Sequence, residues 1–358
     1  MAQQKKKKVL IYYTYENHMG GPRTYIRSIM ESPLKDRYDF KVCYQNCRPG
    51  GLNFGLLKRM IAAIRAENPD IVHVQGLQSE GFYGTLASKL AGCRHIVMTV
   101  HGFAFDGDGT GKLKKWLYRY AVEPLTLRLS DNVFCVCESA SKRKIIRMHA
   151  GKRSCGYIYN PIPPMVTASS RAAMRQKLGI GEQETVFVIA GRVVEGKGFG
   201  ILENAVKQLN ARDINGFKLL VLGDGEYRGI FEERMSEEIR CGQVIMVGQT
   251  DSVPDYLLAS DVFILPSYHE NLPIALLEAG KTGIPCIASN VDGIPEIISD
   301  NETGLLVDSF DFEDYAKAME YMMTHKDAAR EMGKRFSADV QERFSIERFC
   351  EKLSEVYG

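Results

Sequence analysis

Short, mostly apolar runs of strand length recur along this chain, and segments with a helical pattern separate them. The first run covers residues 9–13, and a helical pattern follows it after Gly20-Gly21-Pro22. Apolar runs without strict alternation predict strands buried on both faces, which is typical of a parallel sheet covered by helices. Further runs of this kind are 40–43, 71–74, 95–100, 133–136, 186–190, 217–222, 244–247, 262–265, 285–288 and 304–307. The sequence therefore predicts an α/β protein.

Prolines near residue 160 interrupt this alternation and divide it into two blocks. They lie in Tyr159-Asn160-Pro161-Ile162-Pro163-Pro164. A chain of 358 residues has the length of two domains, each large enough to bury its own core. We therefore predict two doubly wound domains, over residues 1–163 and 164–340, followed by a carboxy-terminal helix over 341–358. The sequence leaves the packing partner of this amphipathic helix open, with the first domain as one candidate.

The charge of the chain is distributed unevenly. Residues 1–160 contain 26 Lys and Arg against 12 Asp and Glu, a net charge of +14, whereas residues 161–358 contain 20 against 32, a net charge of −12. This asymmetry indicates an anionic partner for the first half alone. Cations lie beside aromatic residues in Lys112–Tyr120, and Lys142-Arg143-Lys144 with Arg147, Lys152 and Arg153 adds a second basic patch. We find no nucleic-acid recognition motif, so we expect an anionic membrane surface as the partner and no nucleic acid. The alternative is that Trp116 belongs to the core and the lysines are only solvated.

Cysteine usage and hydropathy predict where the protein works. The nine cysteines are an odd number and include no C-x-x-C pair, which favours a reducing compartment. No secretory signal is recognised after the first lysine run, and no run approaches the ~18 apolar residues of a membrane-spanning helix. We expect a cytoplasmic protein, peripheral on the inner face of the plasma membrane.

Ligands of open α/β sheets bind beyond the carboxyl ends of strands, and the segment after the run 186–190 is chemically unusual. It reads Gly191-Arg192-Val193-Val194-Glu195-Gly196-Lys197-Gly198. Its spacing approaches a Walker A loop, but Gly198 stands where Ser or Thr must hold magnesium, which excludes a P-loop NTPase. A glycine turn with two cations at a helix start suits a diphosphate. Solvated surface charge is the alternative.

The segment after the run 262–265 carries two carboxylates around the start of a predicted helix. Pro273 marks the first turn, Glu270 stands just before the helix, and Glu278 lies just over a turn inside it. Glu278 follows the apolar residues 274–277, and a carboxylate in such surroundings needs hydrogen-bond donors, which the hydroxyls of a ribose would supply. Alternatively, Glu278 is an exposed helix residue and Glu270 caps the helix start.

The first domain offers weaker candidates. Gly20-Gly21 follows its first predicted strand, and His101 follows the strand 95–100. Either could face a cleft, or be an ordinary turn and a structural histidine.

Several other motifs fail on spacing or context. Gly223-Asp224-Gly225 lacks the dinucleotide fingerprint, so we expect no nicotinamide cofactor. Asp106-Gly107-Asp108 is a D-x-D within a glycine-rich loop, where acidic residues form turns. Cys135 and Cys137 lack zinc-ligand spacing, and no serine has a G-x-S-x-G setting. We therefore expect no metal site.

Over essentially its whole length the chain resembles the retaining glycosyltransferases of family four, which have the GT-B architecture. The most specific element is the pair Glu270 and Glu278, eight positions apart, within the segment 259–285. In the family pattern an aromatic residue and a glycine often follow the first glutamate, whereas Asn271 and Leu272 stand here. Further matching segments are Gly20-Gly21, Thr99-Val100-His101-Gly102, Val136-Cys137-Glu138-Ser139, Gly191-Arg192 and Lys197-Gly198.

The resemblance implies two Rossmann-like domains facing a central cleft and a hexosyl transfer with retention at the anomeric carbon. The donor would be a nucleotide-diphosphate sugar, with a UDP-sugar expected, and the acceptor a saccharide or a lipid-linked molecule of cell-surface polysaccharide or glycolipid synthesis. No cofactor or metal would be required, because cations neutralise the departing diphosphate. Closure about residues 160–165 would assemble the site.

The resemblance also implies a role for each candidate residue. Arg192 and Lys197 would bind the diphosphate, and Glu278 the ribose. His101 would contact the sugar. Glu270 would orient the sugar together with the backbone of Asn271, Leu272, Pro273 and Ile274, in which every residue but the proline has an N–H to donate. Val247 and Gly248 would line the site of the base. Gly20 and Gly21 would form the amino-terminal glycine loop.

Two other function classes fit the same residues. A sugar-nucleotide epimerase of the same shape could use Glu270, Glu278 and His101 for proton transfer, and would convert a donor without any acceptor. A non-catalytic nucleotide-sugar-binding protein would have little use for the cations of 191–197 together with both glutamates.

Overall fold

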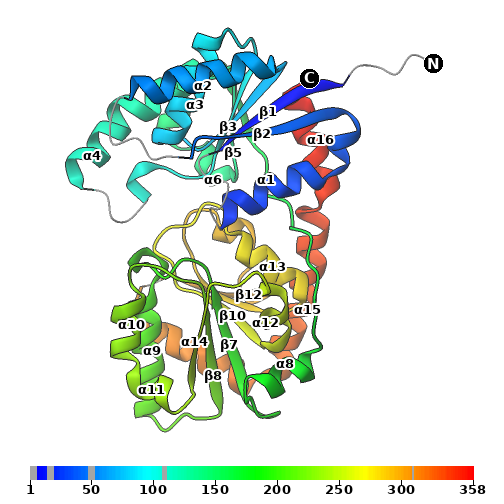
Figure 1. The fold of residues 1–358 in the computed structure, drawn as a ribbon. Coiled ribbons are helices and arrows are strands. Elements are labelled where there is room, and N and C mark those ends of the chain that lie inside the picture. Colours follow the sequence, from blue (N-terminus) through cyan, green and yellow to red (C-terminus); the bar gives the residue numbers. More distant parts are fainter. Residues whose placement is uncertain (1–5, 14–19, 47–52, 107–110, 309) are drawn as a thin grey trace. The chain divides into compact units, whose positions relative to one another are not determined.

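The computed structural model describes residues 6–13, 20–46, 53–106, 111–308 and 310–358. The chain forms two compact units (Figure 1). Unit 1 contains Met1–Pro161 and Ile346–Gly358, and unit 2 contains Ile162–Ser345. The chain thus leaves unit 1 within the proline-rich segment and returns to it at Ile346.

Unit 1 is built on a six-stranded parallel sheet in the order β2-β1-β3-β4-β5-β6. The strands are β1 (Lys7–Tyr13), β2 (Tyr38–Tyr44), β3 (Ile71–Gln75), β4 (Ile96–Val100), β5 (Asn132–Cys135) and β6 (Ser154–Tyr157). The first five were predicted and are confirmed. β6 was missed because it is short, lies at the sheet edge and has no apolar run.

Helices cover both faces of this sheet. On one face, Tyr12 of β1 contacts Met60 of α2 and lies against Gly84 of α3. On the other face, α1 and α16 pack against β3 and β4. The helices of unit 1 are α1 (Gly21–Glu31), α2 (Phe54–Glu67), α3 (Ser79–Ala91), α4 (Lys112–Leu117), α5 (Glu123–Leu129), α6 (Glu138–Ser141), α7 (Lys144–His149) and α16 (Ile346–Tyr357).

A buried chain of polar side chains attaches α16 to unit 1. His73 of β3 is fully buried, and its Nδ1 lies 2.7 Å from the hydroxyl of Tyr357, its Nε2 2.6 Å from Oγ1 of Thr99. The Thr99 hydroxyl also lies 3.4 Å from that of Tyr25 in α1. Burial lowers the pKa of His73 to about 3, so the ring is neutral and needs one donor and one acceptor.

Replacing Tyr357 with Phe is expected to destabilise unit 1 by about 1–3 kcal/mol, because His73 Nδ1 is then buried without a partner. The measurement is urea unfolding at pH 7. Tyr120→Phe is the matched control, since Tyr120 is 60% exposed. Equal unfolding midpoints for the two variants would show that the Tyr357 hydroxyl does not hold α16 in place.

Unit 2 contains a second six-stranded parallel sheet, in the order β12-β11-β10-β7-β8-β9. The strands are β7 (Thr185–Ala190), β8 (Phe217–Leu222), β9 (Val244–Gly248), β10 (Val262–Leu265), β11 (Cys286–Ser289) and β12 (Gly304–Val307), all of which were predicted. The chain runs outward from β7 to β9 and then returns to β7's other side at β10. The direction of winding therefore reverses between β7 and β10, which is where doubly wound sheets bind ligands.

The helices of unit 2 pack around a core that includes Phe187, Phe199 and Phe231. α13 packs closely on α15, because a Cβ at Gly280 would lie 2.9 Å from the methyl groups of Val340. This packing fixes α13 at its place beside the winding reversal. The helices are α8 (Arg171–Lys177), α9 (Phe199–Ala211), α10 (Arg228–Arg234), α11 (Ser236–Arg240), α12 (Val253–Ala259), α13 (Ile274–Thr282), α14 (Phe312–Thr324) and α15 (Lys326–Arg343).

Candidate active site

Two loops meet at the winding reversal of unit 2. One follows β7 and ends at Gly198, and the other follows β10 and ends at Pro273. The amide of Tyr268 in the second loop donates a hydrogen bond to the carbonyl of Gly196 in the first, at 3.0 Å. Gly198 has φ +73°, and a Cβ there would lie 1.9 Å from the carbonyl oxygen of Pro266. Only glycine allows the loops to approach this closely.

The loop after β8 packs against the same place. A Cβ at Gly223 would lie 1.8 Å from the carbonyl oxygen of Gly191, and one at Gly225 would lie 2.3 Å from that of Val193. These glycines, which lack the dinucleotide spacing, allow backbone to pack on backbone. The amide of Gly223 also donates to the carbonyl of Gly248 at 2.8 Å, which brings the end of β9, with Val247 and Gly248, beside these loops.

Lys197 and Glu270 form an ion pair at this edge of the sheet. The Lys197 ammonium donates to Oε1 of Glu270, and the two side chains are only 23% and 11% exposed. The hydroxyl of Ser267 donates to the same carboxylate oxygen at 3.0 Å. Two candidate residues, assigned from the sequence to different parts of a ligand, are therefore each other's partners in this structure.

The loop after β11 fixes the backbone of Glu270. Its amide donates to Oδ2 of Asp292 at 3.2 Å, and its carbonyl accepts from the amide of Gly293 at 3.0 Å. Asp292 has φ +47°, an uncommon conformation for a residue other than glycine. Glu270 is thus held by residues that follow three different strands.

Arg192 and Glu278 contrast with this well-bonded pair. Arg192 is exposed, and no carboxylate in the described segments forms an ion pair with it. Glu278 lies in α13, where burial raises its pKa to about 7, and no described residue donates a hydrogen bond to its carboxylate. The burial of Glu278 and its lack of described hydrogen-bond donors agree with the expectation of a carboxylate in apolar surroundings. They differ from the alternative, in which Glu278 is an exposed helix residue.

The residues between the two glutamates are mostly buried. Pro273 was predicted to lie in the first turn of the helix, whereas in the structure it immediately precedes α13, which begins at Ile274. Leu272 and Ile274 are buried. Oδ1 of Asn271 is buried and finds no hydrogen-bond partner among the residues that the structure describes.

In unit 1, the candidate residues lie at the carboxyl edge of the first sheet. Gly20 has φ +118° and precedes α1, whose first residue is Gly21. His101 follows β4, and its Nε2 lies 2.8 Å from Oε1 of Gln75 at the end of β3. The ring of Tyr25 contacts it edge-on, with centroids 4.9 Å apart. Burial lowers the pKa of His101 to about 4, so the imidazole is neutral.

Acidic residues do not gather as metal ligands in the described ranges. Asp106 of the rejected D-x-D has its carboxylate bound by Arg143, at 2.6 and 2.8 Å, and Gly107 and Asp108 lie outside the described residues. No group of three His, Cys, Asp or Glu side chains in those ranges could hold an ion.

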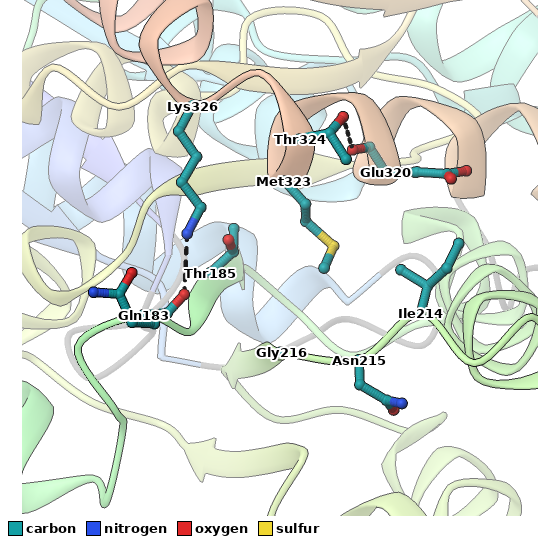
Figure 2. A pocket seen from close by; sticks show the side chains of 9 residues that line it. All are labelled: Gln183, Thr185, Ile214, Asn215, Gly216, Glu320, Met323, Thr324 and Lys326. Atoms are coloured by element: carbon teal, nitrogen blue, oxygen red, sulfur yellow. Dashed lines mark hydrogen bonds between the residues drawn. The ribbon is translucent and has the colours of Figure 1, made fainter.

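A hollow of about 370 Å³ lies at the opposite edge of the second sheet (Figure 2). Its lining includes Thr185 and Gly216, at the amino ends of β7 and β8, and the Lys326 ammonium, which donates to the carbonyl of Gln183 at 3.0 Å. Because the polar candidates all follow the carboxyl ends of strands, this hollow is not part of the candidate site.

Sequence reasoning missed Ser267, Asp292 and Gln75. Each ends or follows a strand, so the rule that ligands bind beyond the carboxyl ends of strands, which selected residues 191–198 and 266–280, also covers these three residues. Asp292 lies in the loop after β11, where no motif stands out, and Gln75 directly follows the predicted strand 71–74.

Comparison with known proteins identifies the family of the chain. The family model "Glycosyl transferases group 1" matches residues 170–338, and "Glycosyl transferase 4-like domain" matches residues 20–155. The chain is 27% identical over 319 residues to a UDP-Gal:α-D-GlcNAc-diphosphoundecaprenol α-1,3-galactosyltransferase of Escherichia coli, covering 85% of this chain and 81% of that protein. It is also 27% identical over 310 residues to N-acetyl-α-D-glucosaminyl L-malate synthase of Bacillus anthracis, covering 85% and 78%.

Among solved structures, Anabaena HepE in complex with UDP and glucose superposes with a TM-score of 0.81 at 17% identity, covering 98% of this chain and 99% of that one. This likeness and the two parallel six-stranded sheets identify the fold as GT-B, as predicted. With both halves of the sequence matched, the chain belongs to the group 1 glycosyltransferases.

Proposed function

We propose that this glycosyltransferase moves a sugar from a UDP-sugar to a saccharide or lipid-linked acceptor with retention at the anomeric carbon. The observation that carries the proposal is the Lys197–Glu270 ion pair at the winding reversal of unit 2, with Arg192 in the loop that carries Lys197 and Glu278 in the helix α13 that follows Glu270. The names of the E. coli relative and of the HepE complex, which mention UDP-galactose and UDP, support a UDP donor. A lipid-linked acceptor is supported by the undecaprenol compound in the first of these names.

In this proposal the diphosphate binds to cations and to a helix start. Arg192 and Lys197 neutralise its charge, and the amino terminus of α9 at Phe199 adds the positive end of a helix dipole. Such fixed charges stabilise a leaving group without a divalent ion. Glu278 accepts hydrogen bonds from the ribose, and Val247 and Gly248 lie beside the base.

Glu270 is proposed to orient the transferred sugar. Once phosphate binds Lys197, the Glu270 carboxylate loses its strongest partner and becomes an acceptor for sugar hydroxyls. The hydrogen bonds of the Glu270 backbone, to the Asp292 carboxylate and from the Gly293 amide, keep Glu270 in place during this exchange. In unit 1, His101 is proposed to hydrogen-bond a sugar or acceptor hydroxyl as a neutral imidazole.

A turnover assay with a panel of UDP-sugars tests this function. Each donor is incubated with a short lipid-diphosphate saccharide in excess EDTA, and NMR determines the anomeric configuration of the product. We expect a product with the donor's configuration. Conversion of the donor to an epimer without acceptor would instead establish the epimerase, and nucleotide-sugar binding with no turnover for any acceptor would favour a binding protein.

We further propose that α4 attaches the enzyme to an anionic membrane. The described part of the chain has no helix long and apolar enough to span a bilayer. Instead, α4 and the π-helical segment Tyr118–Val122 that continues it, at the periphery of unit 1 in Figure 1, expose Leu113 (82%), Trp116 (56%), Leu117 (49%) and Tyr120 (60%). Their spacing places them on one helix face, beside Lys112, Lys114, Lys115 and Arg119. Trp116 is therefore not a core residue.

The second basic patch is a weaker candidate, because its charges are partly engaged. Arg143 binds Asp106 and lies over the ring of Phe103, and Lys142 pairs with Glu138. Membrane attachment is therefore assigned to α4.

Replacing both Leu113 and Trp116 with Ser is expected to weaken binding to anionic vesicles at least about tenfold, since burial of each side chain contributes about 1.5–3 kcal/mol when complete. Cosedimentation at low and high salt measures it, because each engaged cation contributes about 1 kcal/mol that salt reduces. Val166→Ser is the matched control, as Val166 is 84% exposed in unit 2. Equal binding by the double variant and this control would reject α4 as the attachment site.

A further inference from the structure

We propose that Gln75 is a positioning residue of the transfer reaction, which fixes the tautomer of His101 so that Nε2 carries the proton and Nδ1 presents its lone pair to the ligand. The inference rests on the proposed role of His101 and adds to it the direction of the hydrogen bond: His101 accepts from a sugar or acceptor hydroxyl.

The strand register brings the two side chains together. Gln75 pairs with Thr99 across β3 and β4, and His101 follows Thr99 by two residues, so both side chains lie on the face covered by α1. Gln75 is only 5% exposed. Its Oε1 lies 2.8 Å from Nε2 of His101.

An amide oxygen can only accept, so the nitrogen facing it must be protonated. Because His101 is neutral, its other nitrogen, Nδ1, then has a lone pair, and no described residue hydrogen-bonds to that atom. The edge-on contact with Tyr25 restrains the ring. His101 is thereby prepared to accept one hydrogen bond at Nδ1.

Two further observations indicate that this arrangement serves the site and not the core. Nε2 of Gln75 is buried and has no partner within the described segments, so His101 is the one side chain this amide bonds to there. A buried amide with an unpaired atom calls for an explanation other than stability. In contrast, His73 faces two hydroxyls, of Tyr357 and Thr99, and each of these can donate or accept. Hydroxyls leave a tautomer undetermined, whereas the Gln75 oxygen determines it.

The test combines NMR of the ¹⁵N-histidine-labelled enzyme with kinetics. In the wild type, the ring nitrogens of His101, assigned by their loss in His101→Asn, are expected to show the Nε2–H tautomer. In Gln75→Leu, and in the unbranched Gln75→Met should the first fold poorly, we expect a mixture of tautomers and a fall in kcat of about tenfold. The dissociation constant of UDP, which binds to unit 2 in the proposal, should stay unchanged.

Thr85→Val is the matched control, because the Thr85 hydroxyl is likewise buried in unit 1 without a partner among the described residues. It should leave both the His101 signals and kcat unchanged, and His73 provides an internal reference in every spectrum. An Nδ1–H tautomer in the wild type, an unchanged tautomer in Gln75→Leu and Gln75→Met, or a changed tautomer with unchanged kcat would each overturn the proposal. Failure of the proposed function would show itself separately, as absence of sugar transfer by the wild type.

Discussion

Replacing Lys197 with Met is expected to lower kcat by about a hundredfold to a thousandfold, the usual effect of removing one contact to the charge that develops on a leaving group. Methionine keeps the apolar stem of the side chain and removes only the ammonium. The loss has two parts, because Lys197 is proposed to bind the diphosphate and also holds Glu270 in the unliganded enzyme.

Binding of UDP, which has the diphosphate but lacks the transferred sugar, separates the two parts. Lys197→Met should weaken UDP binding about tenfold or more, since a charge-assisted hydrogen bond contributes about 1.5–3 kcal/mol. Glu270→Gln should bind UDP as tightly as the wild type or more tightly, because the ammonium no longer has to leave a carboxylate. Isothermal titration calorimetry measures both constants.

Lys207→Met is the control for loss of a paired lysine in unit 2, because Lys207 pairs with Glu203 within α9. It should retain wild-type kcat and UDP affinity. If Lys197→Met binds UDP normally and loses activity only to the extent that Glu270→Gln does, then Lys197 acts through Glu270 alone, and its assignment to the diphosphate is wrong.

The sequence predicted the sheets well because buried parallel strands leave a strong local signal. The run 262–265 is apolar at every position and became a strand with every residue buried. β6 has no such signal, since two of its residues are Ser154 and Gly156 and its place at the sheet edge is set by pairing with β5. The partner of α16 was equally hidden, because the hydrogen bond between Tyr357 and His73 joins residues 284 positions apart.

The candidate site shows the same division between local and long-range information. Spacing and residue type alone were sufficient to select Lys197, Glu270 and Glu278. That Lys197 and Glu270 are ion-paired could not be inferred, since it depends on the adjacency of β7 and β10. The positions of Gln75 and Asp292 likewise depend on neighbouring strands, and neither residue belongs to a motif that stands out in one dimension.

Replacing Glu278 with Gln is expected to stabilise the unliganded enzyme at pH 8 and to weaken its binding of UDP. Burial raises the pKa of Glu278 to about 7 from its ordinary value of 4.5, so between these values the folded state binds more protons than the unfolded state. Stability contributed by the protonated group is therefore complete below about pH 4.5 and lost as pH rises to about 7. At pH 8 the buried charge costs about 3 kcal/mol. The glutamine of the variant carries no charge, so this variant should melt about 5–10 °C higher at pH 8, with little difference below pH 5.

UDP binding should change in the opposite direction, because ribose hydroxyls donate to a carboxylate more strongly than to an amide. We expect Glu278→Gln to bind UDP about tenfold to a hundredfold more weakly at pH 8. As pH falls below about 7, wild-type Glu278 becomes protonated and this advantage should shrink. The ionisation of UDP itself is common to both proteins, so the ratio of their dissociation constants isolates the contribution of Glu278 to UDP binding.

Thermal melts and calorimetry from pH 5 to 8 measure the stability and the UDP affinity of both proteins. Glu302→Gln is the control, because Glu302 is exposed, and its stability is expected to stay within about 0.5 kcal/mol of the wild type. A variant that melts below the wild type at pH 8, or binds UDP equally well, would show that Glu278 serves the fold and not the ligand.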